Sequence, residues 1–259
     1  MINAVANNLR QRSIALVRQL EASHRQIMLY WTMVASFACG LRLAAGHFTA
    51  MPLPAQFVSA LPYVLVIGAP IVSLLLALHW FRGSDRMPQP GLRLASFGQW
   101  RSIAGHEARR HALYGATGIM ASLLIGILLN IPVRTFEFLA AMPVLGATPP
   151  TWFGTLYGLM LIDVVLLCSL YAVAFVAALR HVPLFPRLLA MIWVVDILMQ
   201  IGIARTMASD PDLPPRVAGA LHALLDGNLK KVLISVALWA PYLLLSKRVN
   251  VTFRHRIPR

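Results

Sequence analysis

Six long apolar stretches, separated by shorter segments rich in charged residues, proline and glycine, dominate the pattern of this chain. A helix needs about 20 residues to cross roughly 30 Å of hydrocarbon, because each residue adds about 1.5 Å along its axis. All six stretches approach or exceed that length. The pattern therefore predicts an all-α bundle of six membrane-spanning helices, at approximately 27–48, 61–81, 112–131, 152–179, 184–204 and 229–246.

The composition agrees with a membrane protein. Of the 259 residues, 58% are hydrophobic and only 12% are charged, with a mean hydropathy of +0.69. Soluble domains carry about 25% charged residues, so an ordinary soluble domain is excluded. The formal net charge of +14 would suggest nucleic acid as the partner of a soluble protein. In a membrane protein the positive charge instead indicates which loops face the cytoplasm, so we expect no nucleic-acid partner.

The basic residues gather on one side when the six spans are threaded alternately. Of the 23 Lys and Arg residues, 16 lie before the first span, after the sixth, or in the second-to-third and fourth-to-fifth connections, and Arg187 at the start of the fifth span makes 17 on that side. Because loops rich in Lys and Arg stay in the cytoplasm, both termini are predicted to be cytoplasmic. Anionic lipids of the cytoplasmic leaflet are then the expected partners. The first apolar run is long enough to span, so we expect an anchor and not a cleaved signal.

The chain divides into an N-terminal part and a larger C-terminal part. Leucines on one face predict an amphipathic surface helix within 1–26, although a solvated lead-in helix fits as well. Residues 27–81 form a transmembrane hairpin, and 82–111 form a cytoplasmic connector that becomes helical after a Pro- and Gly-rich start. Residues 112–254 hold the other four spans, followed by a basic tail at 255–259.

Two segments on the opposite side carry polar residues near the membrane edge. Residues 130–150 include Arg134, Glu137 and two aromatic residues, which fits a helical elbow in the interface. Residues 205–228 read as Pro-rich turns followed by a short amphipathic piece.

The end of the chain carries a recognisable signature, made of Pro241, Tyr242, Ser246, Arg248, Val249, Thr252 and Phe253. It resembles the ending of domain of unknown function family 2569, a family of small bacterial inner-membrane proteins. Leu243 stands where that family has Phe, and Asn250 where it has Lys. The resemblance covers about 112–254 and implies a bacterial inner-membrane location. It implies no activity, cofactor or catalytic residue.

Two aspartates lie within predicted spans, where an ionisable residue costs about 2.5–3.5 kcal/mol on insertion scales. Asp163 and Asp196 flank the turn around His181 at 18 and 15 residues, so antiparallel helices bring them to a similar depth. If their faces meet, like charges would make one carboxyl hold a proton. The pair is therefore a candidate proton or cation site.

Other polar side chains extend this candidate site. Trp193 and Gln200 share the helical face of Asp196, whereas the neighbours of Asp163 are apolar, so its partner must come from another helix. The last span offers a polar stripe that we predict faces the bundle interior near the aspartates: Lys231, Ser235, Trp239, Tyr242 and Ser246. Aspartates and polar stripes also serve ordinary helix packing, so both interpretations stay open.

Several other features of the sequence say less about function. The Gly154 and Gly158 pair has the spacing that allows close helix approach. His106 and His111 are five residues apart, one too many for a helical zinc pair, so no metal or cofactor is expected. Arg42 near the end of its span is expected to reach the membrane surface. Cys39 and Cys168 lie within spans and are expected to be packing residues.

The sequence contains no nucleophile paired with a base and no phosphate loop, so an enzyme is not expected. The first expectation is a non-enzymatic membrane protein that binds or organises a protein or lipid partner. The second is a small proton- or ion-linked transporter that uses Asp163 and Asp196. A lipid-modifying enzyme is the third.

Overall fold

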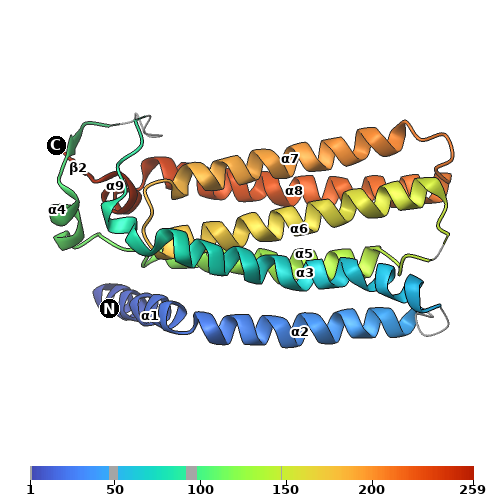
Figure 1. Ribbon diagram of the computed structural model, residues 1–259. Helices are drawn as coiled ribbons and strands as arrows, with labels where there is room; N and C mark the ends of the chain where they lie inside the picture. Colours follow the sequence, from blue (N-terminus) through green and yellow to red (C-terminus); the bar gives the residue numbers. More distant parts are fainter. Residues whose placement is uncertain (1, 47–51, 92–97, 147) are drawn as a thin grey trace.

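Figure 1 shows the computed structural model of the chain, which describes residues 2–46, 52–91, 98–146 and 148–259. Within these residues six helices are long and apolar enough to cross a membrane, so the prediction of a six-span helical membrane protein is confirmed. They are α2 (His24–Ala45), α3 (Leu53–Trp80), α5 (Ile119–Ala141), α6 (Thr151–Leu179), α7 (Phe185–Ala208) and α8 (Pro215–Leu245). Both termini lie at the same end of the bundle (Figure 1).

The third span lies further along the chain than the sequence predicted. Helix α5 begins at Ile119 instead of 112, because Gly115 and Gly118 adopt φ values of 103° and 67° that favour glycine and interrupt a helix. The backbone N–H of Gly115 donates instead to Thr252 Oγ1, at 3.0 Å.

The same helix also continues past the predicted end at 131. Pro132 lies inside α5, and of the polar residues that suggested a membrane edge, Arg134 has its partners inside the bundle while Glu137 pairs with Lys231 on the neighbouring helix α8. The predicted interfacial elbow is therefore wrong for 130–141, which is part of a spanning helix.

The last span is longer than predicted. Helix α8 has 31 residues and starts at Pro215, so the predicted short amphipathic piece and the span at 229–246 are one continuous helix. Proline is favoured at the first helical position, because its missing N–H would be unpaired there in any case. An ion pair at 2.8 Å between Lys230 and Asp226, one turn apart, supports the helix across Gly227.

Helix α6 is the centre of the bundle. More than half of the residues in its most apolar stretch are buried. Helix α6 packs most extensively on α3, α5 and α7, while α8 packs on α7 (Figure 1). In the part of the chain that the structure describes, no other helix approaches Gly154 or Gly158 closely, because a Cβ added at either position would meet no atom within 4 Å. Larger side chains on another face, such as Tyr157 and Met160, make the buried contacts instead.

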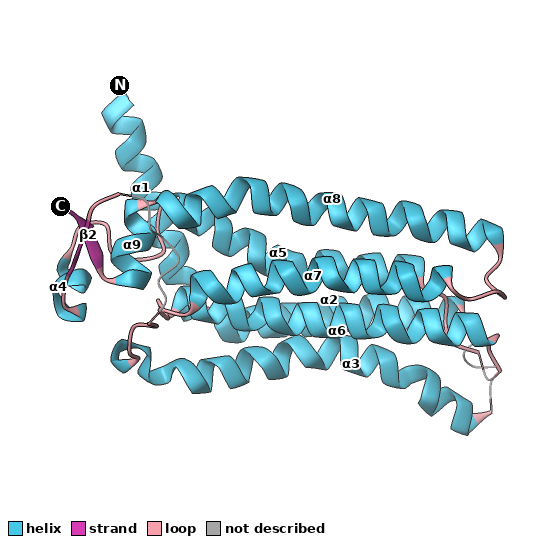
Figure 2. Cartoon of the chain, turned by 90° about the horizontal axis from the view of Figure 1, so that it is seen from above, coloured by secondary structure: helices cyan, strands magenta, loops and turns pink. Residues whose placement is uncertain are grey.

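Helices α1 (Ile2–Ala22) and α2 lie at the edge of the molecule. A helix at the start of the chain was predicted, and Figure 2 shows α1 turning away from the bundle axis. Trp31 Nε1 of α2 donates to the carbonyl of Ile67 on α3, at 3.0 Å. Arg42, which was expected to reach the membrane surface, donates from Nε and Nη2 to the carbonyl of Met142 just past the end of α5, at 3.0 and 2.8 Å. Polar contacts thus fix α2 near both of its ends.

One end of the bundle carries a small cap, which we call the capped end. It is formed by the short helices α4 (Gly105–Arg110) and α9 (Lys247–Arg254) and the strands β1 (Trp100–Ser102) and β2 (Arg256–Pro258). A 3₁₀ helix, η2 (Phe81–Arg86), leads into it from α3. The two strands pair antiparallel, so the predicted connector and basic tail form a small sheet that the sequence did not suggest.

The C-terminal signature residues hold this cap together. Arg248 Nη1 donates to Thr117 Oγ1 at 2.6 Å and to the carbonyl of Leu113 at 3.2 Å, which fixes the segment before α5. The Phe253 ring packs against Phe185 with centroids 5.0 Å apart. Ser246 caps α9 through the N–H of Val249. These residues therefore have structural roles.

Candidate functional site

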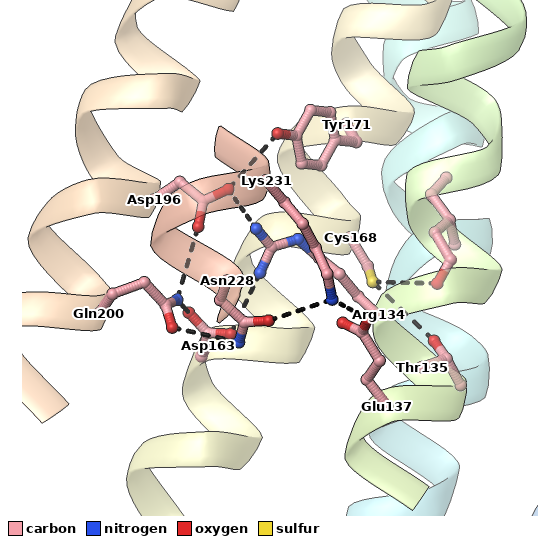
Figure 3. A network of polar contacts seen from close by, with 11 residues as sticks. Arg134, Thr135, Glu137, Asp163, Cys168, Tyr171, Asp196, Gln200, Asn228 and Lys231 are labelled. Carbon is pink, nitrogen blue, oxygen red and sulfur yellow. Dashed lines mark hydrogen bonds and ion pairs between the residues drawn. The ribbon is translucent and has the colours of Figure 1, made fainter. Parts of the chain in front are cut away.

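The two intramembrane aspartates meet at one arginine. Arg134 of α5 donates through Nη1 to Asp163 Oδ2, at 3.3 Å, and through Nη2 to Asp196 Oδ2 (Figure 3). All three side chains are buried, with exposed fractions of 9%, 5% and 0% for Arg134, Asp163 and Asp196. We call these three residues the triad.

The helix register explains why the aspartates coincide. Asp163 lies 12 residues after the start of α6 at Thr151, and Asp196 lies 12 residues before the end of α7 at Ala208. Both are therefore about 18 Å from the same end of antiparallel helices, at 1.5 Å per residue. Arg134 lies seven residues before the end of α5, closer to that end of the bundle than the aspartates, and its long side chain spans the difference.

Gln200 satisfies the two aspartate oxygens that Arg134 does not contact, while Tyr171 adds a second donor to Asp196 Oδ2 and Asn228 holds the Gln200 amide. Gln200 Nε2 donates to Asp163 Oδ1 at 3.1 Å and to Asp196 Oδ1 at 3.5 Å. Tyr171 donates to Asp196 Oδ2 at 3.5 Å, and Asn228 Nδ2 of α8 donates to Gln200 Oε1 at 3.2 Å. The triad is thus connected to four of the six long helices.

A second, more exposed ion pair borders the triad. Lys231 of α8 pairs with Glu137 of α5, and its Nζ also donates to Asn228 Oδ1 at 3.4 Å. The Lys231 side chain is 58% exposed, in contrast to the triad. This pair therefore joins the buried network to the outer face of α5 and α8.

A small cavity reaches the triad from that side. It has a volume of about 60 Å³, and its lining includes Arg134, Asp196, Glu137, Lys231 and Ser235. A smaller void of about 10 Å³ lies beside Asp163. The larger cavity is lined by polar groups and has room for water beside the guanidinium and the Asp196 carboxylate.

The triad does not balance its own charge. Two carboxylates share one guanidinium, which leaves a formal charge of −1, and the neighbouring Lys231 and Glu137 cancel each other. The sequence left open whether the two carboxyls meet; both contact Arg134, which the sequence analysis did not place with them. The excess charge remains, and one proton or one monovalent cation would cancel it.

The polar stripe of the last span is only partly at this site. Lys231 and Ser235 line the cavity, whereas the Trp239 and Tyr242 rings pack on each other at 6.0 Å, further toward the capped end. Ser246 lies at the N-terminus of α9. Trp193 is buried one turn from Asp196.

Sequence reasoning missed the residue that organises the site. The predicted partner of Asp163 was sought on the last span, but Arg134 on α5 and Gln200 on α7 provide it. Arg134 was assigned to an elbow because it lies with Glu137 and two aromatic residues at a predicted membrane edge. An arginine three residues before Glu137 in an otherwise apolar stretch was the available signal. Asn228 was placed at the end of the short amphipathic piece before the last span, and not in the site.

Within the described ranges, no three His, Cys, Asp or Glu side chains come together as metal ligands would. Comparison of the chain with family models, curated proteins and solved structures gave no match. The contacts of the triad are therefore the basis for a functional proposal.

Proposed function

We propose that this protein is a proton- or cation-linked transporter of the bacterial inner membrane, with the triad as its proton or cation site. The observation that carries this proposal is that Asp163 and Asp196, both buried in the bundle, share the single guanidinium of Arg134.

An uncompensated charge at membrane depth is costly, and proteins that keep one use it along proton or ion paths. A proton or a monovalent cation on either aspartate would neutralise the triad. Its release would restore the competition of two carboxylates for Arg134. The site thus has two states that differ by one charge, which is what coupling to a proton or cation gradient requires.

We further propose that the capped end faces the cytoplasm, because most of the basic residues lie in the segments at that end. The triad then lies near the middle of the membrane, and its cavity opens beside Lys231 and Glu137. The binding of a protein or lipid partner, which the sequence favoured first, now comes second. Among the described residues inside the bundle, no site for such a partner is defined by specific contacts as the triad is. No contact in the triad supports a lipid-modifying enzyme.

Ion flux in proteoliposomes tests the proposal. Vesicles loaded with a pH-sensitive dye, with an imposed K⁺ diffusion potential and with Na⁺ present or absent, should acidify faster with the protein than without it. Asp163→Asn and Asp196→Asn should each reduce this flux at least tenfold. Asp226→Asn, which changes an exposed acid on α8 in the same way, should leave it within twofold.

Only variants that elute as the wild type does on size exclusion are compared. Wild-type vesicles that carry neither protons nor Na⁺ faster than empty vesicles would overturn the proposal. So would Asp→Asn variants that fold and transport normally.

A further inference from the structure

Arginine side chains gather within the cap, away from the triad. Arg254 is the last residue of α9 and only 4% of it is exposed. Its Nη1 donates to the carbonyl of Leu243 at 2.9 Å and to Asn250 Oδ1 at 3.3 Å. Its Nη2 is buried, and among the described residues it has no hydrogen-bond partner. Buried polar atoms almost always have a hydrogen-bond partner, so this nitrogen is available to donate to a bound ligand.

A second arginine has the same deficit. Nη2 of Arg187, in the first turn of α7, is also buried without a hydrogen-bond partner in the described part of the chain. The two arginines belong to adjoining segments, because the rings of Phe185 in α7 and Phe253 in α9 pack with centroids 5.0 Å apart. Burial and the nearby positive charges of Arg256 and Arg187 lower the pKa of Arg254 to about 10. Among the described residues, the ion pairs that form involve neither Arg187 nor Arg254. The cap thus holds excess positive charge in a shielded place.

We infer that Arg187 and Arg254 form a binding site for a phosphate group at the capped end. The planar guanidinium matches a phosphate oxygen pair, and two such groups can hold one phosphate from two sides. The start of α7 adds the partial positive charge of a helix N-terminus. Because both nitrogens are shielded, their attraction for an anion is stronger than that of an exposed arginine.

The position of the site identifies two sources for the phosphate. Arg187 lies in the first turn of α7, one of the six helices long and apolar enough to cross a membrane, and the end of such a helix is expected at the depth of lipid headgroups. The phosphate is therefore that of an anionic lipid headgroup or a free phosphate from the adjoining solution. This inference does not depend on the transport proposal, since no triad residue contributes to it.

Native mass spectrometry of the full-length protein in detergent, titrated with phosphatidylglycerol, tests the site. Arg187→Gln should lower the occupancy of the first bound lipid at least tenfold. Arg110→Gln removes one positive charge from an exposed position on α4 in the same cap, and should change occupancy less than twofold. Arg254→Gln provides a second variant, but its loss of contacts to α8 can impair folding, so Arg187→Gln carries the test.

Thermal unfolding with inorganic phosphate, compared with sodium chloride at equal ionic strength, separates the two sources. Lipid retention that depends on Arg187 supports a headgroup site, and a rise in Tm with phosphate that Arg187→Gln abolishes supports a free phosphate. Equal effects of Arg187→Gln and Arg110→Gln on both readouts would overturn the inference, because they would indicate only non-specific attraction to a basic surface. Absence of any lipid or phosphate binding would overturn it as well.

Discussion

At the scale of single residues, Arg134 and the two aspartates are not equivalent. Removing Arg134 leaves two buried carboxylates without a cation, whereas neutralising one aspartate leaves a balanced pair with the other. Breaking a buried ion pair by removing one partner costs about 3–5 kcal/mol, because the remaining charge is left uncompensated. Loss of Arg134 is therefore expected to destabilise the protein more than neutralisation of either aspartate.

We predict that Arg134→Met lowers the free energy of unfolding by about 3–5 kcal/mol, whereas Asp163→Asn changes it by less than about 1 kcal/mol. Equilibrium unfolding in mixed micelles measures both. Arg205→Met, on an exposed position of α7, is the matched control. Arg134→Met combined with Asn at both aspartates should recover most of the loss. An Arg134→Met protein as stable as the Arg205→Met protein would contradict the prediction.

At the scale of elements, the short helix α9 determines where a spanning helix begins. Thr252 is fully buried, and its Oγ1 accepts the N–H of Gly115 in the segment before α5. Arg248, one turn earlier in α9, donates to the carbonyl of Leu113 in the same segment. The residues at 112–118 are apolar enough to continue a helix, but these contacts and two glycines with positive φ hold them outside it.

Thr252→Val keeps the shape of the side chain and removes the acceptor for Gly115. We expect it to lower the free energy of unfolding by about 1–3 kcal/mol, because a buried N–H is left unpaired. Thr206→Val, on an exposed position of α7 where the hydroxyl bonds only its own helix, should cost less than about 0.5 kcal/mol. Chemical unfolding of the two variants side by side gives the comparison. Equal stabilities would mean that α9 does not fix the start of α5.

At the scale of the whole molecule, the even number of spans brings both termini to the capped end. The topology then depends on which side of the membrane the capped end faces. The two native cysteines help in measuring it. Cys39 and Cys168 are free but buried, with exposed fractions of 2% and 1%, so the folded protein should give little background with thiol reagents.

Single-cysteine labelling in spheroplasts should show which end is outside. An impermeant maleimide should label Asp212→Cys, in the exposed turn between α7 and α8, and should not label His106→Cys on α4 at the capped end. Both positions should react equally after lysis. Labelling of His106→Cys in intact spheroplasts would reverse the proposed topology and put the phosphate site on the outer face.

The sequence alone determined that this is a six-span helical protein and that Asp163 and Asp196 lie at one depth. These conclusions depend on apolar length and on the fixed rise of a helix, which are local properties. Only the tertiary structure decided that Arg134 lies between the aspartates, that α5 starts at Ile119, that Gly154 and Gly158 face open space and that the chain's tail pairs with β1. Those features depend on which helix faces meet and on contacts between residues far apart in the chain, and no local pattern of residues encodes them.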